Sequence, residues 1–123
     1  MKIKSLEFTN IYKMFLHSAN IFLDRRCLGV RNVLHSYKCI KEDKIQEQLL
    51  LDDKYVWQTY GDVRNRIIKV AVGLREIPCL NPKGNVIIYG DTSVEWFVCA
   101  MACFKNNYKV VTMYPNLGND GIR

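Results

Sequence analysis

The sequence predicts an α/β fold, and its last third carries the clearest signals. Residues 86–89 form a short apolar run of strand-forming type, and Gly90-Asp91 marks a turn after it. Residues 93–105 then have the character of a helix, and residues 110–114 form a second β-branched run. Strand, helix and strand of these lengths predict a parallel βαβ unit over residues 86–114 with a right-handed crossover.

The helix of this unit is predicted to be buried on more than one side. Thr92-x-x-Glu95 has the pattern of a capping box at its start. Its apolar residues cover nearly the whole circumference: Trp96, Phe97, Val98, Ala100, Met101, Ala102 and Phe104. A chain of 123 residues offers little material to cover such a helix. We therefore expect that part of its packing partner is polypeptide outside this sequence.

A second helix is predicted over residues 59–77. Thr59-x-x-Asp62 forms a capping box, which places a carboxylate near the positive end of the helix dipole. Pro78 marks the end of the helix. The predicted buried stripe consists of Tyr60, Val63, Ile67, Val70, Ala71 and Leu74.

The first part of the chain predicts a peripheral helix and strands over residues 9–57. Apolar residues recur at helical spacing after Thr9, which is the expected N-cap, and residues 33–40 read as a strand. Residues 42–54 combine helix formers with a Leu49-Leu50-Leu51 run. We favour a small hairpin in which this run pairs with residues 55–57 across an Asp52-Asp53 turn. Trp57 and Trp96 are expected to be core anchors.

Composition and charge place the chain among ordinary globular proteins. It has 49% apolar residues and a net charge of +6, but its basic residues are scattered, which indicates a solvated surface rather than a binding patch. Five cysteines without a C-x-x-C pair favour a reduced, intracellular protein. The longest apolar run, residues 96–104, is far shorter than the ~20 residues that span a bilayer.

No catalytic, cofactor-binding or metal-binding residue is predicted from the motifs. Gly90-Asp91-Thr92 stands where phosphate loops occur, but it has one glycine, no lysine and an aspartate, so helix capping is the better reading. Cys99 and Cys103 have metal-ligand spacing but lack a second pair, which favours buried thiols. His17 and His35 are isolated, and His17 is expected at the surface.

Read as a string, residues 86–114 resemble eukaryotic long-chain acyl-CoA synthetases, which activate fatty acids and belong to the adenylate-forming superfamily. The resemblance covers residues 9–123, and its E-W-x-x-x-x-x-A-C-F-K string is specific to the long-chain branch. The shared segments are Glu95-Trp96, Ala102-Cys103-Phe104-Lys105, Val110-Val111-Thr112-x-Tyr114, Leu117-Gly118, Cys27-Leu28-Gly29-x-Arg31, Trp57-Gln58-Thr59-Tyr60 and Gly73-Leu74.

The resemblance implies a parent enzyme, a long-chain fatty acid–CoA ligase that works through an acyl-adenylate and uses ATP, Mg²⁺ and coenzyme A. The family relies on a Ser/Thr/Gly-rich phosphate loop ending in Pro-Lys, a later Thr-Glu, an Asp that holds the ribose, and a C-terminal lysine. None of these motifs occurs in residues 1–123. The resemblance therefore implies an incomplete N-terminal portion of the AMP-binding large domain, inactive alone and binding no cofactor itself.

The resemblance also implies a location on the cytosolic face of the endoplasmic reticulum, the mitochondrial outer membrane or the peroxisome. Family members commonly carry an N-terminal membrane anchor, and residues 1–8 are too short and polar to be one. The implied partners are a long-chain fatty acid, ATP and coenzyme A, without nucleic acid.

Two rival interpretations remain at this point. The first is a truncated, noncatalytic binding or regulatory module derived from the same family. The second is an unrelated small basic α/β domain that binds nucleic acid or anionic lipid, which is weakened by the absence of a clustered basic stripe or an aromatic stacking pattern.

Overall fold

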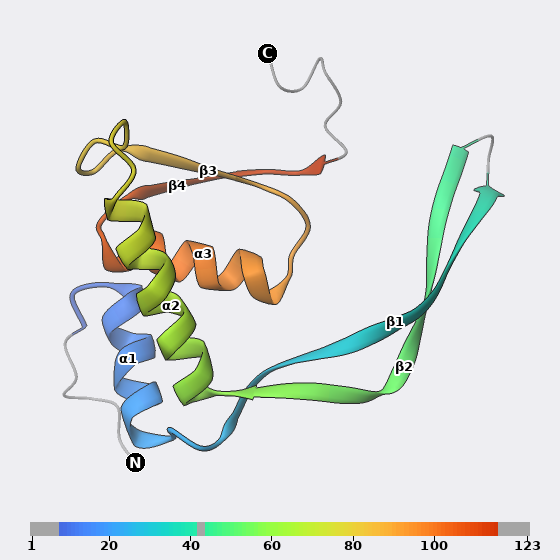
Figure 1. Ribbon diagram of the computed structural model, residues 1–123, viewed down its shortest axis with the longest axis horizontal. Coiled ribbons are helices and arrows are strands. Elements are labelled where there is room, and N and C mark those ends of the chain that lie inside the picture. Colours follow the sequence, from blue (N-terminus) through green and yellow to red (C-terminus); the bar gives the residue numbers. More distant parts are fainter. Residues whose placement is uncertain (1–7, 42–43, 116–123) are drawn as a thin grey trace.

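The computed structural model describes residues 8–41 and 44–115 as an α/β arrangement of three helices and two separate sheets (Figure 1). The helices are α1 (Ile11–Ile21), α2 (Tyr60–Arg75) and α3 (Val94–Lys105). The strands are β1 (Arg26–Lys41) and β2 (Lys44–Thr59), which pair antiparallel, and β3 (Asn85–Tyr89) and β4 (Lys109–Met113), which pair parallel. The predicted fold class is therefore confirmed.

The β3-α3-β4 segment forms the parallel unit expected from the sequence. Pairing runs from Asn85↔Lys109 to Tyr89↔Met113, and α3 runs along the sheet (Figure 1). The helix is capped by Ser93, whose side chain accepts a hydrogen bond from the Trp96 backbone N–H at 3.1 Å. The prediction of Thr92 as the cap was wrong by one residue, because the hydroxyl that faces the first turn belongs to its neighbour.

The core lies where the three helices meet. Its buried residues are Tyr12, Phe15 and Ala19 from α1, Val63, Ile67 and Ala71 from α2, and Val94, Val98, Met101 and Ala102 from α3. The predicted α2 stripe is confirmed, since Tyr60, Val70 and Leu74 pack against this cluster. Neither tryptophan belongs to it: Trp96 is half-buried and Trp57 is 44% exposed, so the prediction of two core anchors was wrong.

Helix α3 packs against several other elements. It contacts α1 and α2 as well as both strands of the parallel sheet, and six of its residues are buried. The prediction that α3 is buried on more than one side is confirmed. The expectation that part of its packing partner lies outside this sequence stays a prediction, since Trp96, Phe97 and Phe104 are half-buried. The parallel sheet also carries exposed apolar side chains: Ile87 and Tyr89 on β3 are 59% and 56% exposed, and Val111 on β4 is 42% exposed.

The hairpin formed by β1 and β2 is much longer than predicted. The expected turn at Asp52-Asp53 lies inside β2, and the two strands pair from Arg26↔Thr59 to Lys41↔Lys44. At Asp52 the pairing of the two strands is irregular, and the Lys54 backbone N–H donates to the Asp52 side chain at 3.0 Å. The Arg31 side chain donates to the backbone carbonyls of Leu51 and Asp52, which satisfies them at this irregularity.

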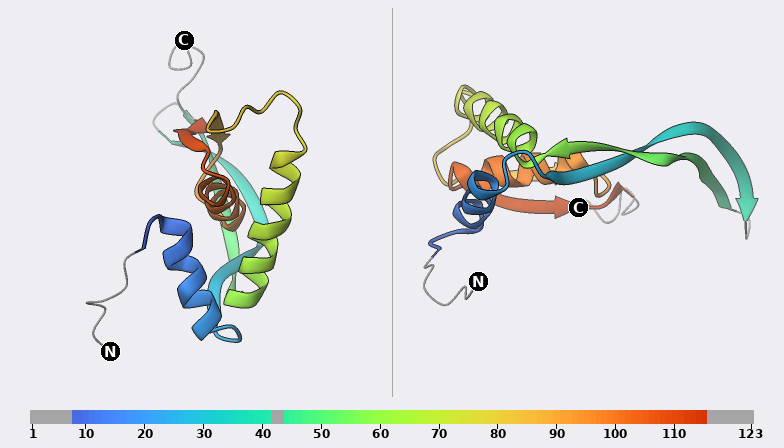
Figure 2. Two further views of the ribbon diagram at one scale, coloured as in Figure 1. Left: turned by 90° about the vertical axis from the view of Figure 1, so that its left-hand side faces the viewer. Right: turned by 90° about the horizontal axis from the view of Figure 1, so that it is seen from below.

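The far part of the hairpin projects away from the helices (Figures 1 and 2). Near its base, the Trp57 ring lies over Gly29, where an added Cβ would come within 2.9 Å of the ring. The Arg26 guanidinium stands 5.5 Å from the same ring. A glycine at position 29 therefore gives the indole room against the opposite strand.

Helix α1 begins one residue later than expected. Asn10, rather than Thr9, is the N-cap, and its side chain accepts a hydrogen bond from the Lys13 N–H at 2.8 Å. His17 is half-buried rather than at the surface, with its ring 5.5 Å from that of Phe8. No helix in residues 8–41 and 44–115 is long and apolar enough to cross a membrane. Residues 1–7 and the Leu117-Gly118 pair lie outside the described part.

The α2 capping box is confirmed atom by atom. The Thr59 hydroxyl accepts from the Asp62 N–H at 3.1 Å, and the Asp62 carboxylate accepts from the Thr59 N–H at 2.9 Å and from its hydroxyl at 2.7 Å. These hydrogen bonds favour the charged carboxylate and lower the pKa of Asp62.

Asp62→Asn is expected to destabilise the protein at neutral pH and to lose this effect in acid. A lowered pKa in the folded state gives stability that is present above the unfolded pKa and disappears as the pH falls through the folded value. Urea unfolding of the unsubstituted protein and of the variant, both expressed from the complete coding sequence, measures the difference in their free energies of unfolding at about pH 7 and at about pH 2. Asp24→Asn, at an exposed carboxylate, is the control. A destabilisation by Asp62→Asn that persists in acid would contradict the charge argument.

Candidate functional site

A depression of about 210 Å³ lies at the carboxyl ends of the two parallel strands. Its wall combines strand ends with the first turn of α3: Gly90, Thr92, Trp96, Thr112, Met113 and Tyr114. The Gly90 N–H donates to the Met113 carbonyl at 3.3 Å, which holds the two strand ends together. In open α/β sheets, ligands bind outside the carboxyl ends of the strands. This depression is therefore the candidate site.

The lining of the depression suits a partly apolar group better than a phosphate. Trp96, Tyr114 and Met113 supply apolar and aromatic surface, and Thr92 and Thr112 supply hydroxyls. None of the six lining residues is charged. Without a lysine, an arginine or a glycine-rich loop, the wall lacks the groups that hold a triphosphate.

An arginine of α2 binds the first turn of α3. Arg66 donates to the Glu95 carboxylate at 3.1 Å and to the Gln58 side chain at 2.8 Å, and so ties α3 to the end of β2. The hydrogen bond from Arg66 is the main reason that the pKa of Glu95 is lowered. Because this carboxylate already pairs with Arg66 and does not line the depression, it is not placed to act as a catalytic acid.

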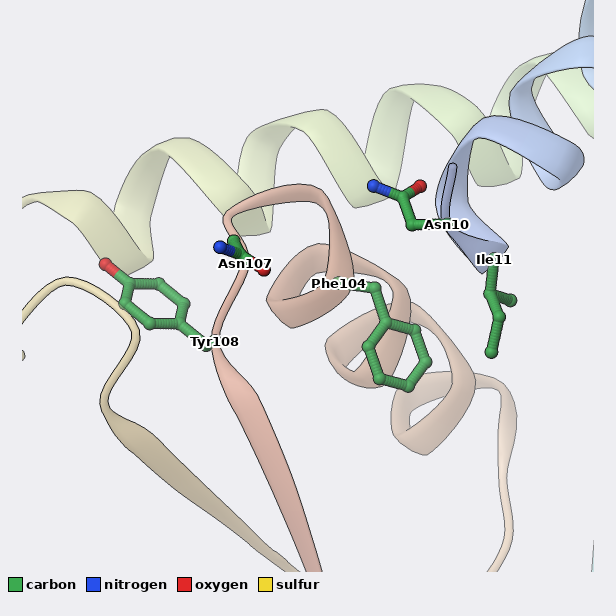
Figure 3. Close-up of a pocket in the computed structure, with 5 residues that line it drawn as sticks. All are labelled: Asn10, Ile11, Phe104, Asn107 and Tyr108. Atoms are coloured by element: carbon green, nitrogen blue, oxygen red, sulfur yellow. The ribbon is translucent and has the colours of Figure 1, made fainter. Parts of the chain in front are cut away.

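A second depression of about 210 Å³ lies between the start of α1 and the end of α3 (Figure 3). Ile11, Phe104 and Tyr108 form its apolar part, and Asn10 and Asn107 supply polar groups. The Asn10 side chain caps α1 by accepting a hydrogen bond from the Lys13 N–H. Asn107 follows the end of α3 and has a left-handed backbone conformation, with φ 61°. The two polar residues of this depression thus have structural roles at helix ends, and we do not take it as the candidate site.

The residues singled out in the sequence do not come together into one site. Gly90 and Thr92 line the strand-end depression, whereas Asp91 is exposed beside it. Cys103 is buried, and burial, followed by the nearby Cys99, raises the pKa of its thiol. His17 and His35 lie on α1 and on the hairpin. Within residues 8–41 and 44–115, no three His, Cys, Asp or Glu side chains are grouped to hold a metal ion.

Four residues of the depression were missed by the sequence reasoning: Trp96, Thr112, Met113 and Tyr114. Trp96 was assigned to the core, and the other three were read only as strand residues. A usable signal was present, because the predicted βαβ unit already placed residues 89–92 and 112–114 at one edge of a parallel sheet.

The family model and the related sequences that match this chain point to the same family. The model of the AMP-binding enzyme family matches residues 40–123. Long chain acyl-CoA synthetase 8 of Arabidopsis thaliana is 31% identical over 109 residues, which cover 89% of this chain and 15% of that protein. Long-chain-fatty-acid–CoA ligase 1 of Schizosaccharomyces pombe is 24% identical over 126 residues, covering 91% of this chain and 18% of that protein. The chain thus spans less than a fifth of the length of these relatives.

Solved structures show the same fold at low sequence identity. The crystal structure of IdnL1 matches 95% of this chain and 20% of its own, with a TM-score of 0.70 and 14% identity. The A-PCP didomain of carboxylic acid reductase from Segniliparus rugosus, in complex with AMP, matches 89% of this chain and 15% of its own, with a TM-score of 0.64 and 17% identity.

Proposed function

The chain belongs to the AMP-binding enzyme family, and from this membership we propose that it is part of an ATP-dependent long-chain fatty acid–CoA ligase. The observation that carries the proposal is the 31% identity to a long chain acyl-CoA synthetase over 89% of the chain. Residues 1–123 are assigned to an N-terminal portion of the AMP-binding large domain. The resemblance to the long-chain synthetases noted in the sequence is supported by both curated relatives.

The proposed reaction has two steps. The fatty acid carboxylate attacks the α-phosphorus of ATP, which forms an acyl-adenylate and releases pyrophosphate. The sulfur of coenzyme A then attacks the acyl carbon, which forms the thioester and releases AMP. In such chemistry Mg²⁺ neutralises charge on the triphosphate.

The described residues do not fit ATP or Mg²⁺ on their own. No group of three candidate metal ligands occurs in residues 8–41 and 44–115, and the strand-end depression has no charged lining residue. We therefore derive no chemical step from this chain and assign triphosphate and metal binding to other parts of a longer polypeptide.

The role of this chain within the ligase is to form one edge of the binding domain. The strand ends at Gly90 and Tyr114 supply an uncharged wall, and Arg66 holds the helix that completes it. Strands of a parallel sheet are normally covered on both faces, and Ile87 and Tyr89 are exposed on β3. We assign the cover of this surface to the rest of the ligase.

An intracellular location on the cytosolic face of an organelle membrane is part of the proposal. ATP and coenzyme A, the two co-substrates, are supplied inside cells. The organelle follows only from the resemblance to the long-chain synthetases, with the endoplasmic reticulum, the mitochondrial outer membrane and the peroxisome as the candidates.

The test is an activity assay on the protein expressed from its complete coding sequence. With ATP, Mg²⁺, coenzyme A and a long-chain saturated fatty acid, we expect acyl-CoA and AMP to form in equal amounts. Acetate in place of the fatty acid is the matched substrate control and should give little product. Chromatographic separation of the nucleotides and thioesters measures both products.

Two outcomes would overturn the proposal. Activity with acetate but not with the fatty acid would keep the family and reject the long-chain assignment. A folded complete protein that forms neither acyl-CoA nor AMP would favour the noncatalytic module.

A further inference from the structure

Two arginines of α2 bind opposite ends of α3. Arg66 donates to the Glu95 side chain at 3.1 Å, at the start of the helix, and Arg75 donates to the Asn106 side chain at 3.0 Å, just past its end. Of the six residues that line the strand-end depression, the one from α3 is Trp96, in the first turn. The two arginines therefore share a residue type and a helix, but it is Arg66 that binds next to the candidate site.

Arg66 joins three elements through one guanidinium group. Its Nη2 donates to Glu95 Oε1 at 3.1 Å, and its Nη1 donates to Gln58 Oε1 at 2.8 Å, close to the end of β2. The planar fork of arginine holds two acceptors in a fixed relative position, whereas the ammonium group of lysine is a point charge on a flexible stem. The start of α3 is thus held in a defined place relative to the base of the hairpin.

The contact contributes more to orientation than to stability. The Glu95 side chain is 70% exposed and the Arg66 side chain 37% exposed, and ion pairs open to water add little to the free energy of unfolding. On the core side, Val94 and Phe97 hold the same turn by apolar packing, which has no preferred direction. Hydrogen bonds do have one. The bonds of Arg66 therefore set the orientation of the turn that carries the Trp96 ring.

We propose that Arg66 is a positioning residue for the strand-end depression: it keeps Trp96 in the wall by holding Glu95, and substrate binding at the wall depends on it. The kinetic consequence rests on the proposed ligase function, and the structural one does not. Because the lining is uncharged, the group that meets it is an uncharged part of the fatty acid or of coenzyme A, rather than the triphosphate of ATP.

Substrate kinetics of the protein expressed from its complete coding sequence measure the first consequence. Arg66→Gln is expected to raise the KM for the fatty acid or for coenzyme A about three- to tenfold, with kcat and the KM for ATP changed less than about twofold. Arg66→Lys keeps the charge without the fork and should give an intermediate KM. Arg75→Gln is the matched control, because it removes the bond at the far end of α3, and its KM values should stay within about twofold.

Hydrogen exchange gives a second measurement that needs no activity. The Trp96 N–H donates to the Ser93 hydroxyl and the Phe97 N–H to the Ser93 carbonyl, each at 3.1 Å, so their exchange reports on opening of the first turn. Arg66→Gln is expected to speed the exchange of these two N–H groups at least about threefold, and the Arg75 control should leave it unchanged.

Four results would overturn the proposal. They are unchanged exchange in Arg66→Gln, equal changes of KM in the two glutamine variants, a rise in the KM for ATP alone, and a loss of kcat with every KM unchanged, which would indicate a merely structural role. If the complete protein forms no acyl-CoA, the ligase assignment fails by itself. Faster exchange in Arg66→Gln would then still support the positioning of the turn, and unchanged exchange would still refute it.

Discussion

Ile67→Ala is expected to lower the free energy of unfolding by about 2–5 kcal/mol, the usual cost of truncating a fully buried isoleucine. The Ile67 side chain has no exposed surface and belongs to the cluster in which all three helices meet. Its neighbours in that cluster come from three separate helices, so no single small movement fills the cavity that the truncation leaves. Urea denaturation of the protein expressed from its complete coding sequence, followed by circular dichroism, measures the loss.

The adjacent Ile68 provides the control. It is on the same helix and loses the same atoms in Ile68→Ala, but it is 37% exposed and lies outside the buried cluster. We expect the control to cost about 1 kcal/mol. Equal losses for the two variants would mean that α2 does not present its predicted stripe to the core.

The helices were predictable because their signals are local. The stripe of α2 repeats every three or four residues, and its capping box lies within four residues of sequence. Such patterns depend little on the rest of the chain. Even so, the caps of α1 and α3 were each displaced by one residue, because Thr9 and Thr92 stand next to the side chains that accept the first-turn hydrogen bonds, Asn10 and Ser93.

The hairpin was less predictable because its register depends on pairing between distant residues. Asp52-Asp53 has the composition of a turn, yet Arg31 binds the backbone carbonyl of Asp52 from the opposite strand and β2 continues past it. Residue 31 lies 21 positions earlier in the chain. A local reading of residues 49–57 contains no information about that contact.

The candidate site was only partly predictable for a related reason. The βαβ pattern indicated which edge of the sheet would be formed by the strand ends, but Met113 and Tyr114 look like ordinary strand residues. Their place in a depression depends on the parallel pairing with β3 and on the position of Trp96 in the first turn of α3. The proposed ligand class rests on the resemblance and on the relatives, and composition alone did not supply it.

Residues 1–123 expressed alone are expected to form no acyl-CoA above the background without enzyme, under conditions in which the complete protein is active. The physical reason is the lack of groups that would stabilise the displacement at phosphorus. The strand-end depression has no charged lining residue, and the described residues contain no cluster of metal ligands. Electrostatic stabilisation of the transition state is usually the largest contribution to such a rate.

The exposed apolar side chains of the parallel sheet predict how residues 1–123 behave in solution when expressed alone. Ile87 and Tyr89 on β3 and Val111 on β4 are exposed, and both sheets have free strand edges. The isolated chain should therefore bind a hydrophobic dye and aggregate with rising concentration, whereas the complete protein should do neither. Thioester formation by a contaminant-free sample would refute the assignment of the chemistry to other polypeptide. A sharp, cooperative melt of a dye-free monomer would instead refute the claim that this surface needs cover, because a surface already stable in water has no need of a further layer.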